Sequence, residues 1–284
     1  YEGHEFLEAS SLRKFAGKYY FIYSSLQSHE LCYAVSDKPT EGFSFGETLI
    51  SNGDIGLVAE EGPQKGKVRT IETAVNDTGN THGSLIEING QHYVFYHRQT
   101  NRKQSCRQAC AEKIRFENNK FYQASMTSCG LNPGPLQGKG EYPANICCNL
   151  YGKKGTKFLS MIKRLPFGVP YLTQTGADFN PEVDKDAPTQ YVKNICDGSV
   201  VGYKYFDLTH TSSVTLKVKG SATGRVEVWG KEALLGQTDI QLKSSQDETD
   251  TAISVPIKGG SLNEPIYIKY FGRGSFSLFR FSFE

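Results

Sequence analysis

The chain has 284 residues, enough for one large domain or two ordinary domains. Its formal net charge is only +2, and no basic run interleaves with aromatic residues, so a nucleic-acid partner is not predicted. No stretch approaches the roughly 20 consecutive apolar residues of a membrane helix, so no membrane partner is predicted either. With 16 Tyr and 17 Phe against one Trp, the composition indicates a β-rich protein with aromatic strands.

The segment from Gly3 to Ser25 predicts a β-hairpin that carries an acid near its first strand. Glu8 stands in the short apolar run of residues 6–9, and residues 19–23 are almost all aromatic or β-branched, which is typical of a strand. Residues 16–18, Ala-Gly-Lys, predict the tight turn between them. Apolar neighbours favour the protonated form of a carboxyl, so Glu8 is a candidate general acid, with a surface Glu as the alternative.

The hairpin recurs later in the chain. From Ser84 to His97 the sequence SLIEINGQHYVFYH repeats the pattern SLRKFAGKYYFIYS of residues 11–24. Repeated strand units of this kind predict propeller blades, whose innermost strands face a central axis. Glu8 and His82 each lie shortly before their repeat, so we expect both near one pocket. His82 is a candidate to bind substrate, orient a carboxylate or coordinate a water or Ca²⁺, and a packed, hydrogen-bonded His is the alternative.

Between the two repeats, residues 31–35 and 43–45 predict two further strands. Residues 48–80 are rich in Gly, Asp and Asn and predict an insertion with a strand-like core at residues 68–75. Long loops on β scaffolds often line sites, so Asp54 in this insertion is a candidate pocket residue.

After the second repeat, Arg98 and Arg107 bracket a predicted loop. A guanidinium donates hydrogen bonds to sugar hydroxyls or carboxylates, so both are candidate substrate-binding residues, with ordinary surface Arg as the alternative. Residues 110–124 predict a pair of strands around Asn118 and Asn119, and residues 144–150 predict a closing strand. Weaker candidates near the site are Glu5, His4 and His97.

A Gly- and Pro-containing segment at residues 151–170 predicts a linker between residues 1–150 and 171–284. The second part contains short alternating runs spaced like the strands of a β-sandwich. Those runs are residues 203–206, 214–218, 226–229, 240–242, 252–257, 266–271 and 276–283. No helix longer than a turn or two is predicted. Trp229 and Tyr203 are candidates for stacking on a sugar, and core packing is the alternative for Tyr203.

The seven Cys are an odd number, so at least one is unpaired. No CxxC or Cys/His spacing resembles a zinc site, so no metal site is predicted, and Cys106 and Cys110 are interpreted as core thiols. This Cys usage favours a reducing, cytoplasmic compartment over secretion.

These segments together resemble a known family. The first hairpin resembles the general-acid segment of glycoside hydrolase family 43 through FLEASSLRK followed by GKYYFIYSS. The second repeat, NTHGSLIEINGQHYVFYHR, resembles the next blade of that family. The segment HELCYAVSDKPTEGF resembles the strand and turn that lie between these two parts in the family. The C-terminal part resembles a β-sandwich similar to carbohydrate-binding module family 6, through ICDGSVVGYKYFDL and VKGSATGRVEVW. The resemblance implies an all-β fold, a partial five-bladed β-propeller followed by a jelly-roll-like β-sandwich.

The resemblance also implies an activity: inverting hydrolysis of glycosidic bonds by a base Asp, a pKa-tuning Asp and an acid Glu. Glu8 corresponds to the acid. The enzyme type that the resemblance implies is an α-L-arabinofuranosidase or β-xylosidase, which acts on arabinan, arabinoxylan or derived oligosaccharides. The two Asp have no match here, so we expect a longer protein to carry them before Tyr1 and expect the isolated chain to be inactive. The family requires no cofactor and allows Ca²⁺, for which this chain has no local ligand pattern.

Two other functions remain open on the sequence. One is a non-catalytic carbohydrate-binding protein, and the other is a structural module without a ligand. The sugar, its linkage and the choice between exo and endo attack depend on the depth of the pocket.

Overall fold

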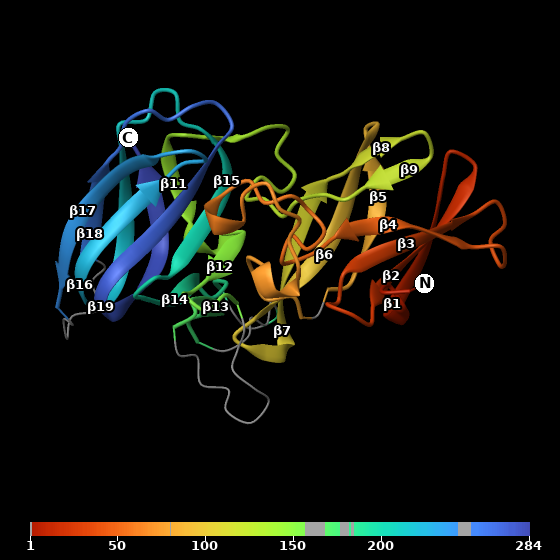
Figure 1. The fold of residues 1–284 in the computed structure, drawn as a ribbon, viewed down its shortest axis with the longest axis horizontal. Helices are drawn as coiled ribbons and strands as arrows, with labels where there is room; N and C mark the ends of the chain where they lie inside the picture. Colours follow the sequence, from red (N-terminus) through yellow and green to blue (C-terminus); the bar gives the residue numbers. More distant parts are fainter. Residues whose placement is uncertain (1, 80, 157–167, 177–181, 183–184, 244–250) are drawn as a thin grey trace. The chain divides into compact units, whose positions relative to one another are not determined.

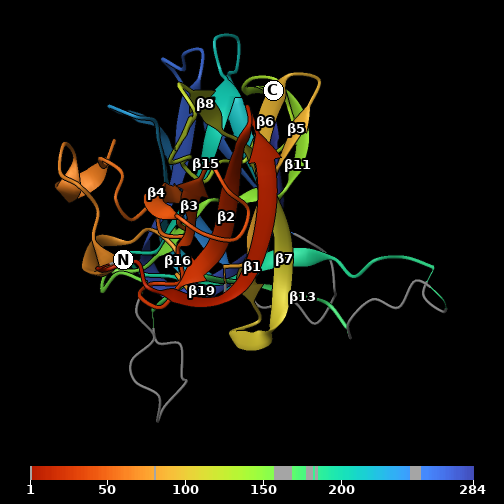
Figure 2. The same cartoon turned by 90° about the vertical axis from the view of Figure 1, so that its right-hand side faces the viewer.

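The computed structural model describes residues 2–79, 81–156, 168–176, 182, 185–243 and 251–284 (Figures 1 and 2). Its regular elements are β-strands and the three-residue 3₁₀ helices η1 (Gly62–Gln64), η2 (Ile71–Thr73) and η3 (Ala144–Ile146), which confirms the all-β fold. Over these ranges no helix is long and apolar enough to cross a membrane. The chain divides into two compact units, the first formed by residues up to 99 and 103–126, the second by residues 100–102 and 127–284.

The first unit begins with a four-stranded antiparallel sheet whose strands pair in sequence order. The strands are β1 (Phe6–Phe15), β2 (Lys18–Ser25), β3 (Leu31–Ser36) and β4 (Ser44–Ile50). Figure 2 shows β1 and β2 side by side in red. The turn between them consists of Ala16 and Gly17, with φ of 46° and 82°, the two-residue type that matches strand twist. A four-stranded up-and-down sheet is the unit of a propeller blade, so the expected propeller-like portion is present.

The predicted repeat is a structural repeat. A second sheet contains β5 (Gly83–Ile88), β6 (Gln91–Thr100) and β7 (Lys103–Lys113). Asn89 and Gly90, with φ of 51° and 78°, join β5 to β6 by the same kind of two-residue turn as in the first hairpin. The matched serines of the two repeats, Ser11 and Ser84, have their Oγ atoms 2.8 Å apart. The first strands of the two hairpins therefore lie side by side.

The segment between these sheets differs from the prediction of a strand at residues 68–75. Ile71–Thr73 forms η2 instead, and only an isolated bridge joins Val58 to Val68. The Thr70 backbone N–H donates to the Thr73 hydroxyl at 2.8 Å, a local side-chain bond that competes with strand pairing. The predicted strand pair around Asn118 and Asn119 is present as β8 (Arg115–Glu117) and β9 (Lys120–Tyr122).

The second unit is organised around two long strands. Its ten strands in the described ranges are β10 (Leu136–Gln137), β11 (Gly140–Pro143), β12 (Asn149–Tyr151), β13 (Tyr171–Gln174), β14 (Gln190–Cys196), β15 (Val200–Asp207), β16 (Ser213–Trp229), β17 (Leu234–Leu242), β18 (Thr251–Pro256) and β19 (Glu264–Phe283). β16 and β19 pair antiparallel along nearly their whole lengths, and shorter strands flank both (Figure 1). Each of them joins two runs that the sequence predicts as separate strands. Their buried side chains, such as Leu216, Val218 and Phe281, form the core of the sandwich.

The division between the units falls earlier than the predicted linker at residues 151–170. β10 and β12 pair with β15, and β11 pairs with β19, so residues 127–151 belong to the second unit. The predicted closing strand at residues 144–150 is replaced by η3 and β12. These strands are two to four residues long and their partners are distant in sequence, which local patterns do not reveal. Residues 157–167 of the predicted linker lie outside the described residues.

Candidate active site and sugar-binding pocket

Glu8 and His82 lie together in the first unit. Glu8 Oε1 is 2.9 Å from His82 Nε2, and the two side chains are 50% and 27% exposed, respectively. The His97 ring packs edge-on against His82, with 4.9 Å between the ring centroids. Glu8 comes from β1 and His82 from the residue before β5, the strand whose Ser84 contacts Ser11 of β1. The repeat thus brings an acid and an imidazole into hydrogen-bond contact, while their roles stay a prediction.

The backbone is irregular at Glu8. The pairing of β1 with β2 shifts register on both sides of this residue, between Phe6 and Glu8 and between Glu8 and Ser11. Ala9 adopts a positive φ of 59°, a conformation that costs energy for a residue with a Cβ. Bulges redirect side chains and are over-represented beside active sites. The irregularity thus gives Glu8 a direction that a regular strand would not.

The expected burial of Glu8 by its apolar neighbours is wrong. Phe6 is 54% exposed, and Ala9 and Glu8 are exposed as well. The hydrogen bond to His82, rather than an apolar enclosure, defines the surroundings of the Glu8 carboxyl.

Asp54 and Arg98 are both buried, with exposures of 5% and 3%. The Asp54 carboxylate accepts the Met126 backbone N–H at 2.9 Å and the Ser125 hydroxyl at 3.2 Å, which holds the insertion against residues 125–126. Arg98 Nε donates to Gln108 Oε1 at 2.8 Å. Both residues thus have structural contacts, and their binding of substrate stays a prediction.

A buried tyrosine adjoins these two residues. Burial raises the pKa of Tyr96 well above its usual value, and the neighbouring Glu112 carboxylate raises that pKa further. The Tyr96 hydroxyl lies 3.3 Å from Glu112 Oε1. Arg107, by contrast, is exposed on β7. Within the part of the chain that the structure describes, no hydrogen bond or ion pair joins Arg107 to Glu8 or His82.

The two aromatic residues predicted as sugar platforms have other partners. Tyr203 is 0% exposed and its hydroxyl donates to the Ala144 carbonyl at 3.1 Å, so its alternative interpretation as core is confirmed. The Trp229 indole N–H donates to Glu227 Oε2 at 2.7 Å, and Lys269 Nζ lies 4.3 Å from the centroid of the Trp229 ring. A lysine therefore occupies a face of the single Trp.

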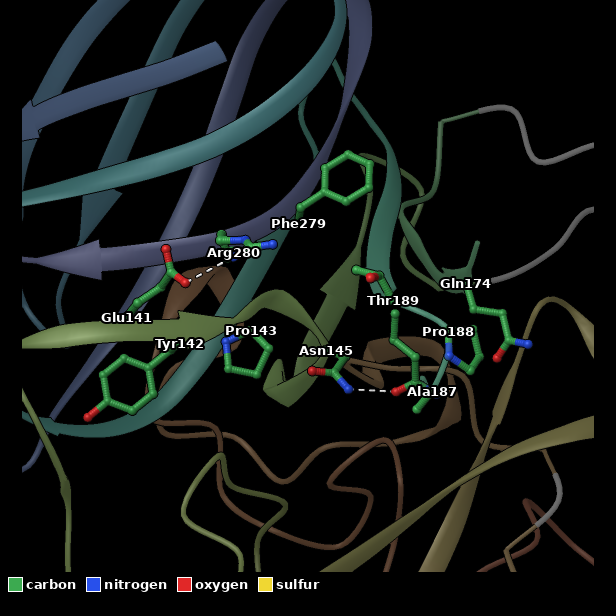
Figure 3. A pocket seen from close by; sticks show the side chains of 11 residues that line it. Glu141, Tyr142, Pro143, Asn145, Gln174, Ala187, Pro188, Thr189, Phe279 and Arg280 are labelled. Atoms are coloured by element: carbon green, nitrogen blue, oxygen red, sulfur yellow. Dashed lines mark hydrogen bonds and ion pairs between the residues drawn. The ribbon is translucent and has the colours of Figure 1, made fainter. Parts of the chain in front are cut away.

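The second unit contains a pocket that the sequence did not predict, with a volume of about 550 Å³ (Figure 3). Its lining combines half-buried aromatic rings, Tyr142 and Phe279, with amide and charged groups. Within it Arg280 pairs with Glu141 at 3.1 Å, and Asn145 donates to Gln190 at 2.5 Å. Its walls come from β11, β13, β14, β19 and nearby loops, so only strand pairing between distant segments assembles it. Mixed aromatic and polar linings of this kind suit small polar ligands.

The Phe279 ring has an aromatic partner outside the pocket lining. It stacks on Tyr191 with 4.5 Å between the centroids and an interplanar angle of 19°. Lys219 Nζ lies 5.3 Å from the centroid of the Phe279 ring. These contacts hold the ring in place at the pocket wall.

No family model matches the chain. A xylosidase/arabinosidase of Thermoclostridium stercorarium is 40% identical over 287 residues, which cover 99% of this chain and 57% of that protein. A beta-xylosidase of Xylanibacter ruminicola is 35% identical over 94 residues, which cover 33% of this chain and 22% of that protein. The chain thus spans little more than half of the first relative.

Two solved structures are also similar. One is a glycoside hydrolase family 43 arabinoxylan arabinofuranohydrolase from Bacillus subtilis, with a TM-score of 0.47 and 17% identity, covering 98% of this chain and 54% of that chain. The other is the family 6 carbohydrate-binding module CsCBM6-3 from Clostridium stercorarium, with a TM-score of 0.38 and 18% identity, covering 54% of this chain and 98% of that chain.

The all-β architecture, the repeated hairpins and the long sequence match place the chain in the class of glycoside hydrolase homologues. Over nearly its whole length the chain is a homologue of a xylosidase/arabinosidase, and it is similar to a solved glycoside hydrolase family 43 enzyme and to a solved family 6 carbohydrate-binding module. The resemblance stated from the sequence is thereby confirmed.

Proposed function

We propose that the protein containing this chain is an inverting glycosidase. It removes arabinofuranosyl or xylosyl residues from arabinan, arabinoxylan or derived oligosaccharides, with Glu8 as the proton donor. The observation that carries the proposal is the 2.9 Å contact of Glu8, which lies on the bulged strand β1, with His82. The 40% identity to a xylosidase/arabinosidase supports the choice of sugar.

The contact suggests how Glu8 works. Inversion needs a protonated carboxyl at the leaving oxygen and a carboxylate that holds water on the opposite face, about 6.5–9.5 Å away. If the neutral His82 ring donates its Nε2–H to Glu8 Oε1, the proton of the acid resides on Oε2 and is available to the glycosidic oxygen. In this arrangement His82 is a positioning residue and Glu8 is the catalytic acid. The proposal assigns the base carboxylate to no residue of this chain.

The test compares Glu8→Gln with Glu5→Gln in the whole protein that contains this chain. Glu5 offers a matched control because it lies on the same segment and contacts the Gly3 N–H and Gln27 instead of His82. We expect Glu8→Gln to lower kcat by about 10²–10⁴ on xylo- or arabino-oligosaccharides, the usual size of general acid catalysis. The loss should be smaller on nitrophenyl glycosides, because their leaving group needs little protonation.

Glu5→Gln should retain activity on both substrate types. Equal activity of Glu8→Gln and the original protein on oligosaccharides would remove Glu8 from the mechanism. NMR spectroscopy that identifies which anomer of the released sugar forms first tests whether hydrolysis inverts the configuration. Assaying the present chain alone tests the expectation that it is inactive.

A second candidate function, carbohydrate binding without catalysis, is favoured by the pocket lined by Phe279 and Tyr142. We expect calorimetric titration with xylo- or arabino-oligosaccharides to detect binding that Phe279→Ala abolishes. Phe271→Ala is the matched control, because Phe271 is 40% exposed on the same strand and does not line the pocket. Binding that survives Phe279→Ala unchanged would exclude this pocket as the site.

A further inference from the structure

Three different metal-binding side chains converge in the first unit, and none of them belongs to the Glu8–His82 pair. They are His4, Glu30 and Cys32, whose Nδ1, carboxylate oxygen and Sγ atoms all lie within 4.8 Å of one another. Their positions in the sequence match no zinc-binding spacing, so the sequence predicts no metal here.

The fold holds each of the three donors in place. Glu30 directly precedes β3 and Cys32 is its second residue, so their side chains, two residues apart, point to the same side of the chain. The Tyr23 hydroxyl donates to the His4 carbonyl at 2.7 Å and anchors that residue beside β3. The His4 ring stacks on Phe45, with 4.7 Å between centroids and an interplanar angle of 15°, which sets the direction of its nitrogens.

The distances suit a tetrahedral ion. Zinc bonds of about 2.0–2.3 Å to N, O and S imply tetrahedral edges of roughly 3.4 Å between N and O and roughly 3.6 Å between N and S. His4 Nδ1 lies 3.3 Å from Glu30 Oε2 and 3.7 Å from Cys32 Sγ. Two edges of the tetrahedron are therefore close to their required lengths without movement of the backbone.

The charge of the three ligands and the access of solvent to them also suit a zinc ion. A carboxylate and a thiolate together neutralise a divalent cation, and this donor set of N, O and S suits zinc better than calcium or magnesium. Cys32 and Glu30 are 0% and 5% exposed, whereas the His4 side chain is 33% exposed and leaves a path from solvent. The Thr48 hydroxyl lies 3.5 Å from Glu30 Oε2 and 3.7 Å from Cys32 Sγ, where it contacts both ligands.

We propose that His4, Glu30 and Cys32 bind one Zn²⁺ ion. The ion joins the segment before β1 to the residues at the start of β3. It therefore links the N-terminal side of the first hairpin to the neighbouring strand. The site lies outside the proposed catalytic pair and is independent of the proposed hydrolase activity.

The test uses the full chain freed of metal and titrated with Co²⁺, which replaces zinc and reports sulfur ligands by a thiolate-to-cobalt absorption band. We expect one equivalent of Co²⁺ to produce this band and Zn²⁺ to displace it. Cys32→Ser should abolish the band. Cys110→Ser is the matched control, because Cys110 is a half-buried thiol in the same unit and should leave the band unchanged.

A second variant keeps the test decisive if Cys32→Ser fails to fold. The partly exposed His4 can be changed to Gln, and we expect Zn²⁺ affinity, measured by competition with a chromophoric chelator, to fall at least about 100-fold. Absence of the sulfur band in the original chain, its persistence in Cys32→Ser, or unchanged affinity in His4→Gln would each overturn the proposal.

Discussion

At the residue scale, the environment of Glu8 comes from contacts that its neighbours in sequence do not supply. The apolar residues around Glu8 predict a buried acid, yet Phe6 is 54% exposed. The partner that the structure supplies is His82, 74 positions away in the chain. The bulge and the positive φ of Ala9 direct the carboxyl toward it. The repeated hairpin thus predicted that Glu8 and His82 lie near each other, but not how exposed the Glu8 carboxyl is there.

A pH dependence belongs to this scale as well. Burial raises the pKa of Tyr33 to about 12 from its ordinary 10.0, and the phenol is 1% exposed. A raised pKa favours the neutral phenol in the folded state, so its stabilising effect is complete below pH 10.0 and is lost as pH rises toward 12. We expect the contribution of Tyr33 to the free energy of unfolding of the first unit to fall by about 3 kcal/mol across this interval. Urea unfolding at a series of alkaline pH values measures it.

The assignment to Tyr33 is checked by ultraviolet absorbance of tyrosinate. Comparing the original chain with Tyr33→Phe isolates the phenol that the substitution removes. That phenol should titrate near the upper end of the interval, and titration near its ordinary value would contradict the prediction. The variant should also lose stability at neutral pH, because the Phe121 backbone groups that contact the hydroxyl are left unpaired.

At the scale of the elements, glycines allow β16 and β19 to lie close together. A Cβ at Gly224 would stand 2.2 Å from the Phe271 carbonyl oxygen, and one at Gly220 would stand 2.5 Å from the Ser275 carbonyl oxygen. Glycines also interrupt the alternation of apolar and polar residues, which is why the sequence predicts two short strands at residues 214–218 and 226–229. In the structure the strand continues through these glycines.

We expect Gly224→Ala to destabilise the second unit by about 1–3 kcal/mol, because the added methyl group meets backbone rather than a flexible side chain. The measurement is urea unfolding of the chain, followed by circular dichroism. Gly134→Ala is the control, since a Cβ there meets no atom within 4 Å, and its effect should stay within about 0.5 kcal/mol. Equal effects of the two substitutions would show that the close approach does not limit stability.

At the scale of the whole molecule, the all-β fold, the repeated hairpins and most strands could be predicted from the sequence. The division into units could not be placed correctly, because strands within residues 127–151 pair with residues that lie 49 to 143 positions later. The pocket beside Phe279 escaped prediction for the same reason, since its walls come from strands far apart in the chain.

Turns such as Ala16-Gly17 and Asn89-Gly90 and the alternation of apolar and polar residues act over a few neighbouring residues, so the amino-acid order by itself determined the hairpins and their repeat. The convergence of His4, Glu30 and Cys32 and the burial of Asp54 and Arg98 depended on folding in three dimensions. The physical reason is that these contacts join segments whose spacing carries no local conformational preference, so only packing and strand pairing bring them together.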